Sequence, residues 1–230
     1  GQFIEHLRHT IKATFHTYHE IESIEKVEGQ YKIRSKTYQD IFDKVIICSP
    51  AYDASTILLE LDKEISYLLD SIPYTPMSVV GLGYEDLNHD LNGFGLLTTA
   101  KAKKNILGIL WDSSIFENRS PVGQKSIRVM IGGQRDIDLA LKSEEELLEL
   151  AKEGIRETMG IDDEPSSVFV KKWERAIPSY EVGHIAKREK IFSLLEQHKN
   201  LYLNSNAYFG VGLNECTKNS KECAKKVCEI

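Results

Sequence analysis

The spacing of apolar residues predicts both helical and extended segments in the first third of the chain. Apolar positions recur at helical spacing over residues 2–13 and again over 62–69. Between these helices the period changes to that of strands, which we expect over 15–28, 30–34 and 36–48. The last of these segments ends in a continuous apolar run, which is typical of a buried strand.

From residue 76 onward the pattern is that of a sheet with accompanying helices. Strands are expected over 77–83, 93–98, 106–113, 126–132 and 168–173. The segment Ser143-Glu144-Glu145-Glu146 is a capping box, which predicts a helix that ends near Gly160. A short helix over 187–196 precedes the closing strand. The sequence therefore predicts an α+β fold with an antiparallel sheet.

The stretch from Leu203 to Cys216 combines the end of a strand, a turn with two glycines and the start of a helix near Asn214. Backbone N–H groups at a helix N-terminus can face an anionic or electron-rich ligand. Gly210 and Gly212 are equally compatible with an ordinary connection between strand and helix. The local pattern does not decide between a ligand-binding turn and a plain connection.

The composition is typical of a globular protein with one large domain or two small ones. The 230 residues are 41% apolar and 28% charged. A net charge of −6 and the lack of a dense Lys/Arg run argue against a nucleic-acid-binding protein. No apolar stretch approaches the roughly 18 residues of a membrane span, and the first residues lack the layout of a signal peptide.

The cysteines and histidines do not follow a metal-ligand pattern. Cys216 and Cys223 would lie roughly 10 Å apart along one helix, which is too far for a shared zinc ion. We expect the cysteines of this helix to be reduced thiols buried on its inner face. The spacing of His6 and His9 falls on an amphipathic helix whose polar face is solvated, so we predict no metal site.

A second dense patch runs from Trp173 to His184. A Trp and a Tyr beside a proline turn occur in packed corners more often than in functional sites. His184 could act as an acid or a base, but a histidine after glycine is also typical of a hydrogen-bonded turn. No carboxylate, Ser or Cys lies at a sequence spacing from His184 that is typical of a catalytic pair, so the catalytic residues stay unknown.

Five motifs follow one another along nearly the whole chain. They are Gly1-Gln2-Phe3 (Gly-Gly-Met-x), Gly93-Phe94-Gly95-x-Leu97 (GFGxL), Ile106 to Pro121 (LGxxxxSxxFxxRxP), Trp173 to His184 (WxxxIPxYxxGH) and Asn206 to Cys216 (a terminal flavin motif). Each motif is weak alone, but the ordered set is specific. Together they resemble the protoporphyrinogen oxidase family, oxygen-dependent flavoenzymes of haem biosynthesis within the flavin amine oxidase superfamily. The resemblance implies an oxidoreductase with FAD as its cofactor.

The resemblance also implies which residues contact the cofactor. Ile21 would meet the adenine of FAD through its backbone, and Trp173 would lie beside the flavin. Val211, Gly212 and Leu213 would present their backbone to the isoalloxazine ring at the start of the last helix. The partial positive charge of a helix N-terminus would there stabilise the reduced ring.

The substrate implied by the resemblance is protoporphyrinogen IX, which would be oxidised stepwise to protoporphyrin IX with oxygen as acceptor. Leu91 and Leu107 match positions that enclose the tetrapyrrole. The alternatives are coproporphyrinogen III oxidation by the same fold and a non-catalytic tetrapyrrole- or nucleotide-binding module. A cytoplasmic protein is expected, with peripheral contact to the inner face of a membrane and the oligomeric state left open.

The resemblance further predicts how the chain is divided. Residues 1–58 would form an FAD-domain segment, residues 59–185 the β-rich substrate-binding domain, and residues 186–230 the returning strand and helix of a Rossmann-like FAD domain. The GxGxxG segment of the family would lie upstream of Gly1. We therefore expect the chain to be the C-terminal portion of a larger flavoenzyme and to be inactive by itself.

Overall fold

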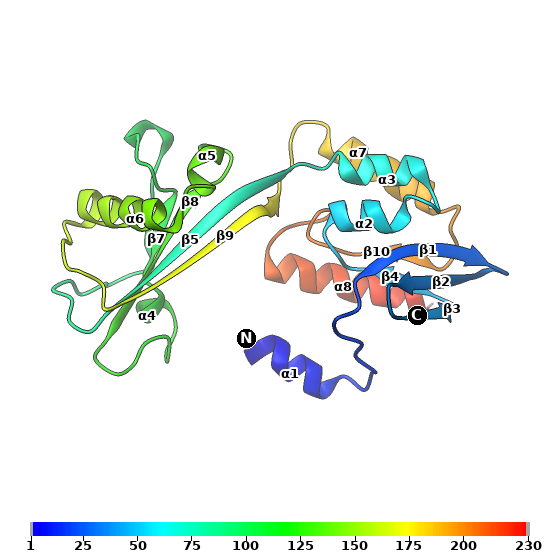
Figure 1. The fold of residues 1–230 in the computed structure, drawn as a ribbon, viewed down its shortest axis with the longest axis horizontal. Helices are drawn as coiled ribbons and strands as arrows, with labels where there is room; N and C mark the ends of the chain where they lie inside the picture. The colour runs from blue at the N-terminus through cyan, green and yellow to red at the C-terminus, as the bar shows by residue number, and fades with distance from the viewer. Residues whose placement is uncertain (1, 229–230) are drawn as a thin grey trace. The chain divides into compact units, whose positions relative to one another are not determined.

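The computed structural model describes residues 2–228, which divide into two compact units (Figure 1). Unit 1 comprises the chain up to Ile72 together with the chain from Glu181 onward, and unit 2 is Pro73–Tyr180. The predicted α+β class with an antiparallel sheet is confirmed. The motif position at Gly1 lies outside the described residues. The assignment of the two units to FAD and substrate domains stays a prediction.

Unit 2 is built on a five-stranded antiparallel sheet with the strand order β6-β7-β8-β5-β9. Its strands are β5 (Tyr74–Tyr84), β6 (Gly95–Leu97), β7 (Gly108–Leu110), β8 (Lys125–Gly132) and β9 (Ser167–Pro178). Successive side chains of a strand point to opposite faces. In β5 the residues Val80, Leu82 and Tyr84 are buried, whereas the positions between them are half-buried. The sheet therefore has one core face and one open face.

The core face of this sheet is covered by a long helix. The helices of unit 2 are η1 (Ala100–Ala102, a 3-10 turn), α4 (Asp112–Ile115), α5 (Ile137–Ala140) and α6 (Glu144–Met159). Leu147, Ala151 and Ile155 of α6 are buried in the same cluster as the core-face residues of β5 and β8. Figure 1 shows α5 and α6 on one side of the strands and α4 on the other.

The predicted ends of α6 are confirmed. The Ser143 hydroxyl accepts a hydrogen bond from the Glu146 N–H, and the Glu146 carboxylate accepts one from the Ser143 N–H. Gly160 ends the helix in the left-handed conformation with φ 68°. Within the helix, Gly154 lets Ile106 approach, because a Cβ at this position would lie 2.7 Å from the Ile106 side chain.

Unit 1 combines two small sheets with helices. Its elements are α1 (Gln2–Thr10), β1 (Ile21–Val27), β2 (Gln30–Ser35), β3 (Gln39–Phe42), β4 (Val45–Ile47), α2 (Ala51–Leu58), α3 (Lys63–Asp70), α7 (His184–Leu195), β10 (Leu201–Leu203) and α8 (Leu213–Cys228). β1, β2 and β3 form an antiparallel sheet, and β4 pairs with β10 in parallel. Parallel pairing requires a long crossover connection, and here unit 2 is inserted in that connection.

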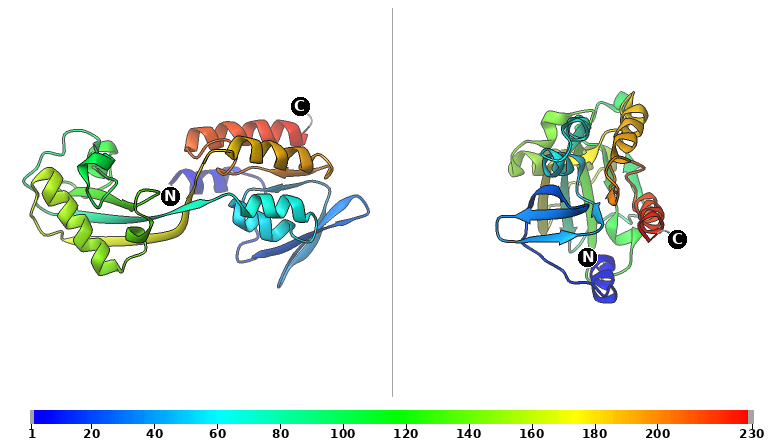
Figure 2. Two further views of the ribbon diagram at one scale, coloured as in Figure 1. Left: turned by 90° about the horizontal axis from the view of Figure 1, so that it is seen from above. Right: turned by 90° about the vertical axis from the view of Figure 1, so that its right-hand side faces the viewer.

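Two polar contacts hold elements of unit 1 together: one joins β2 to the segment before β10, and the other joins α2 to α3. The buried Tyr31 of β2 donates a hydrogen bond of 2.8 Å from its hydroxyl to the carbonyl of Lys199, directly before β10. The helices α2 and α3 lie side by side (Figure 2). Between them is a buried pair, in which the hydroxyls of Ser55 and Ser66 lie 3.0 Å apart. No helix among residues 2–228 is long and apolar enough to cross a membrane.

The structure corrects two predictions of secondary structure in unit 1. The first strand begins at Ile21 rather than at residue 15, because Tyr18 adopts a φ of 64° that an extended strand cannot include. The helix α2 was not predicted. Its N-cap is Pro50, whose φ of −51° and ψ of 155° lie outside the helical region, as is usual for an N-cap residue.

The expected burial of the cysteines on the last helix is also wrong. Cys216 and Cys223 are half-buried and Cys228 is exposed, because α8 buries none of its described residues completely. The predicted helix near the N-terminus is present as α1, but its apolar residues are exposed, with Phe3 at 54% and Ile4 at 62%.

His184 is a packed residue of unit 1 and not an exposed acid or base. It is 7% exposed as the first residue of α7 and forms a hydrogen bond with the backbone of Tyr208. Burial lowers the pKa of His184, and the charges of Arg188 and Lys187 lower this pKa further. The hydrogen bond expected for His184 is present, but the residue begins a helix rather than lying in a turn.

The substitution Ile109→Ala tests the core of unit 2. Ile109 of β7 is 0% exposed within the core cluster, so its truncation should lower the free energy of unfolding by about 2–5 kcal/mol. Both tryptophans, Trp111 and Trp173, belong to unit 2, so urea unfolding followed by tryptophan fluorescence reports on this unit. Val122→Ala, at a fully exposed position, should change the free energy by less than about 0.5 kcal/mol. Equal effects of the two substitutions would show that this core is misassigned.

The substitution His184→Gln tests the state of the buried imidazole. Because the pKa of His184 is lowered in the folded protein, the unfolded chain binds its proton more readily, and stability is lost as the pH falls through about 6.5. The stability lost on substitution should therefore be smaller at pH 5.5 than at pH 7.5, as measured by urea unfolding with circular dichroism. His6→Gln on the exposed helix α1 is the matched control. A cost that stays constant or grows on acidification contradicts the lowered pKa.

Candidate functional site

In unit 1 the candidate site is the turn that leads into α8. Gly210 has φ 136°, and a Cβ there would lie 2.7 Å from the Cβ of Glu215, so this position requires glycine. The Cys216 thiol lies 3.5 Å from the Gly210 carbonyl, and the Cys216 N–H donates a hydrogen bond of 3.0 Å to the carbonyl of Gly212. These contacts fix the backbone path from the strand β10 to the helix.

The turn presents backbone and apolar side chains to solvent. Val211 is 49% exposed and Leu213 is 66% exposed, and Gly212 lies between them. The first N–H groups of a helix have no partner within the helix. A Cβ on Gly212 would overlap the carboxylate of Glu215, so this carboxylate lies at the helix start and already places a negative charge there. The turn therefore suits an electron-accepting ring better than a phosphate.

The adenine contact predicted for Ile21 falls in the same unit. Ile21 is the half-buried first residue of β1 and is paired with Ser35 of β2. The strand register shifts between Ile21 and Ser23, which leaves an irregular backbone at this end of the sheet. The contact of Ile21 with adenine stays a prediction.

In unit 2 the candidate site is the open face of the sheet. The register places on it Gly95 and Leu97 of β6, Gly108 and Leu110 of β7, Ser126, Arg128 and Met130 of β8, Met77, Val79, Gly81 and Gly83 of β5, and Phe169, Lys171 and Trp173 of β9. Its larger apolar side chains are well exposed, with Leu97 at 76%, Phe169 at 64% and Trp173 at 52%. The face is mainly apolar, and Arg128 stands near its centre.

Glycines on this open face allow the backbones of neighbouring strands to lie close together. A Cβ on Gly95, which has φ 132°, would overlap the carbonyl of Ile109, and a Cβ on Gly108 would lie 2.6 Å from the carbonyl of Leu96. Glycine within a strand allows a ligand or another backbone to approach closely. A planar apolar molecule could therefore lie along several strands at once.

A hollow of about 550 Å³ opens on this face between α4, β5 and β9. Its floor includes Gly81 and Gly83, and Phe169 stands at one side. Two arginines, Arg119 and Arg128, also line it. The hollow has the size of a small-molecule site and combines apolar walls with a few charged groups, which is the usual character of such sites.

The structure places the three predicted residues of unit 2 in different surroundings. Trp173 lies on the open face, where the Lys171 ammonium is 4.8 Å from its ring centroid. Leu91 is 1% exposed within the core cluster and has φ 49°. Leu107, directly before β7, is half-buried and packs close to Gly133. The roles predicted for Leu91 and Leu107 in substrate binding stay predictions.

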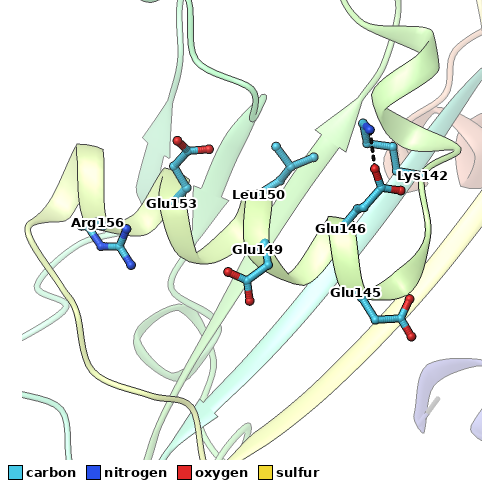
Figure 3. A pocket seen from close by; sticks show the side chains of 7 residues that line it. All are labelled: Lys142, Glu145, Glu146, Glu149, Leu150, Glu153 and Arg156. Carbon is cyan, nitrogen blue, oxygen red and sulfur yellow. Dashed lines mark hydrogen bonds and ion pairs between the residues drawn. The ribbon is translucent and has the colours of Figure 1, made fainter.

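A second hollow in unit 2, of about 500 Å³, lies along the outer side of α6 (Figure 3). It is lined by Lys142, Glu145, Glu146, Glu149, Leu150, Glu153 and Arg156. Figure 3 shows that these side chains come from one helix and the turn before it, with the Lys142–Glu146 ion pair at one end. Four carboxylates against two cations would repel an anionic ligand, so this surface is a solvated helix face.

Sequence reasoning missed the residues of the open face that line the hollow, among them Arg128 and Phe169. The two-residue period of β5, β8 and β9 could have predicted which glycine, arginine and phenylalanine residues share a face with their neighbours in the same strand. It could not have predicted that Gly81 pairs with both Arg128 and Phe169, because pairing depends on strand register.

The chain is similar in sequence to protoporphyrinogen oxidases. The chloroplastic protoporphyrinogen oxidase of Oryza sativa subsp. japonica is 28% identical over 219 residues, which cover 89% of this chain and 39% of that protein. Protoporphyrinogen oxidase of Homo sapiens is 28% identical over 209 residues, 88% of this chain and 44% of that protein. The chain thus spans about two fifths of the length of these curated relatives.

The fold is also found among solved structures. A crystal structure of a candidate protoporphyrinogen oxidase from Exiguobacterium sp. 255-15 superposes with a TM-score of 0.85 at 20% identity, covering 98% of this chain and 50% of that one. The family model of flavin-containing amine oxidoreductases matches residues 1–228. The chain therefore belongs to the flavin-containing amine oxidoreductase family.

Proposed function

We propose that this chain serves in the FAD-dependent oxidation of protoporphyrinogen IX to protoporphyrin IX, with oxygen as acceptor, in haem biosynthesis. In this proposal unit 1 contributes to the flavin site and unit 2 holds the porphyrinogen. The chain would act together with a dinucleotide-binding part, and by itself it would be inactive. The two named relatives are protoporphyrinogen oxidases, which supports this reaction over the other oxidations within the family.

The observation that carries the proposal is the glycine-bearing open face of unit 2 in a chain of a flavin-containing family. A tetrapyrrole is a broad, largely apolar molecule with carboxylate side chains. Leu97, Met130 and Val79 form one row across the strands, and Leu110, Arg128 and Phe169 form part of the next row. Such rows match the breadth of a tetrapyrrole better than that of a small amine.

The residues at the start of α8 fit a flavin ring. Val211, Gly212 and Leu213 offer exposed backbone on a turn whose glycine at position 210 leaves no room for a side chain. When bound, the flavin supplies the redox chemistry. The N–H groups at the start of α8 would orient the ring and stabilise negative charge on it. The open face would exclude water from one side of the porphyrinogen and hold it in position.

The proposed reaction is tested with the full-length flavoenzyme that contains this chain. Porphyrin fluorescence is followed after addition of protoporphyrinogen IX or coproporphyrinogen III in parallel. The proposal predicts faster oxidation of protoporphyrinogen IX. A preference for coproporphyrinogen III would assign the chain to the alternative substrate, and retained flavin without porphyrin formation from either would indicate a non-catalytic binding module.

The two glycines before α8 give a matched pair of variants for flavin binding. Gly210→Ala forces a Cβ against the Cβ of Glu215 at a φ that alanine rarely adopts, whereas Gly212→Ala displaces only the mobile carboxylate end of Glu215. We expect Gly210→Ala to weaken FAD binding about 5- to 150-fold more than Gly212→Ala does, as about 1–3 kcal/mol of strain implies. The measurement is flavin retained by the full-length enzyme during equilibrium dialysis. Equal affinities of the two variants would contradict the placement of the flavin at this turn.

A test of the isolated chain examines whether its flavin site is complete. Incubation of the 230 residues with FAD and subsequent desalting should leave much less than one flavin per chain. The reason is that the turn before α8 carries a carboxylate and suits the ring end of the cofactor, so the phosphates need other partners. Stoichiometric flavin absorbance after desalting would refute this expectation.

A further inference from the structure

We propose that Arg119 and Arg128, at the hollow on the open face of unit 2, form a carboxylate-binding subsite that holds an acidic side chain of the porphyrinogen. This inference rests on the proposed function and deepens it, since it assigns the polar end of the substrate to named residues.

Arg128 presents a cation in the middle of a mainly apolar face, which also carries Lys171 on its edge strand. It is the β8 residue paired with Gly81 of β5 on one side and with Leu110 of β7 on the other. Its Nη2 donates a hydrogen bond of 2.6 Å to Asp112 at the start of α4. The Nε of Arg128 is shielded from solvent and has no hydrogen-bond partner among residues 2–228. Asp112 thus uses one donor of a five-donor fork and fixes the orientation of the guanidinium.

Arg119 supplies a second cation at the same hollow. Its guanidinium carbon lies 5.2 Å from the ring centroid of Phe116, and no carboxylate partner of Arg119 occurs among the described residues. With Asp112 as the one acidic residue among those that line the hollow, the two arginines leave it with a net charge of +1. A carboxylate is the group that this planar donor geometry recognises best.

The neighbouring surface fits the body of a tetrapyrrole that bears such a carboxylate. Phe116 and Phe169 line the hollow, and Gly81 and Gly83 leave its floor open. Phe169, Lys171 and Trp173 share the open face of β9. Four residues of strand place Trp173 about 13 Å from Phe169. A macrocycle could therefore lie along β9 while its acidic side chain reaches the arginines.

The test uses the intact chain and two related probes. Protoporphyrin IX carries free carboxylates, whereas its dimethyl ester has the same ring without the negative charges. Quenching of the tryptophan fluorescence of unit 2 gives the dissociation constant of each probe. The parent chain should bind the free acid at least about tenfold more tightly than the ester, which is the range of a charged hydrogen bond.

Arg119→Gln and Arg128→Gln should each weaken binding of the free acid about tenfold or more and leave binding of the ester unchanged. Arg128→Lys should bind the free acid more tightly than Arg128→Gln does but less tightly than the parent chain, since lysine keeps the positive charge and lacks the planar set of guanidinium donors. Arg156→Gln is the matched control, because Arg156 forms an ion pair of the same 2.6 Å length with Asp162 near the end of α6. If Arg128→Gln unfolds unit 2, Arg119→Gln still decides the question, since Arg119 has no ion pair among the described residues to lose.

Three results would overturn the subsite: equal affinity of the parent chain for acid and ester, unchanged affinity of the two Gln variants, or no binding of protoporphyrin IX by the parent chain. The full-length enzyme separates this failure from failure of the proposed function. Porphyrin formation with an unchanged KM in Arg119→Gln would reject the subsite and retain the reaction. No porphyrin formation by the parent enzyme would reject the reaction itself.

Discussion

The two-residue period of the central sheet is the constraint on which the rest of unit 2 depends. Burial of Val80 and Leu82 of β5 under α6 fixes the register of the strand, since a slip by one residue would turn every apolar side chain to the wrong face. The same register determines what the other face displays. Gly81 must then lie between Arg128 and Phe169, so the core and the candidate site are two consequences of one pairing.

The two units offer complementary chemistry, each by a different physical means. In the proposed function, the backbone at the turn before α8 would contact the flavin, because the required glycine at position 210 excludes a side chain and a helix start carries partial positive charge. On the open face of unit 2, apolar side chains around Arg128 would contact the porphyrinogen. A flavin enzyme needs both, since the cofactor performs the redox step and the protein positions its substrate.

Much of the fold could be predicted from the sequence, where a local signal decides the local structure. The capping box at Ser143 and the stop at Gly160 bound α6 as expected, and the strands of the sheet followed from their apolar patterns. The errors arose where tertiary context decides, as at the positive φ of Tyr18. Motif resemblance singled out Trp173, which the structure places on the open face, but gave no indication of Arg128, whose position depends on pairing across the sheet.

In the proposed function the open face of unit 2 binds the porphyrinogen. Hydrogen–deuterium exchange of the chain with and without protoporphyrin IX can locate this ligand without a substitution. We expect slower exchange in residues 112–124, which include α4, and in the edge strand β9, with no change in the outer helix α6. Protection of α6, or saturating binding without protection of either residues 112–124 or β9, would contradict this expectation.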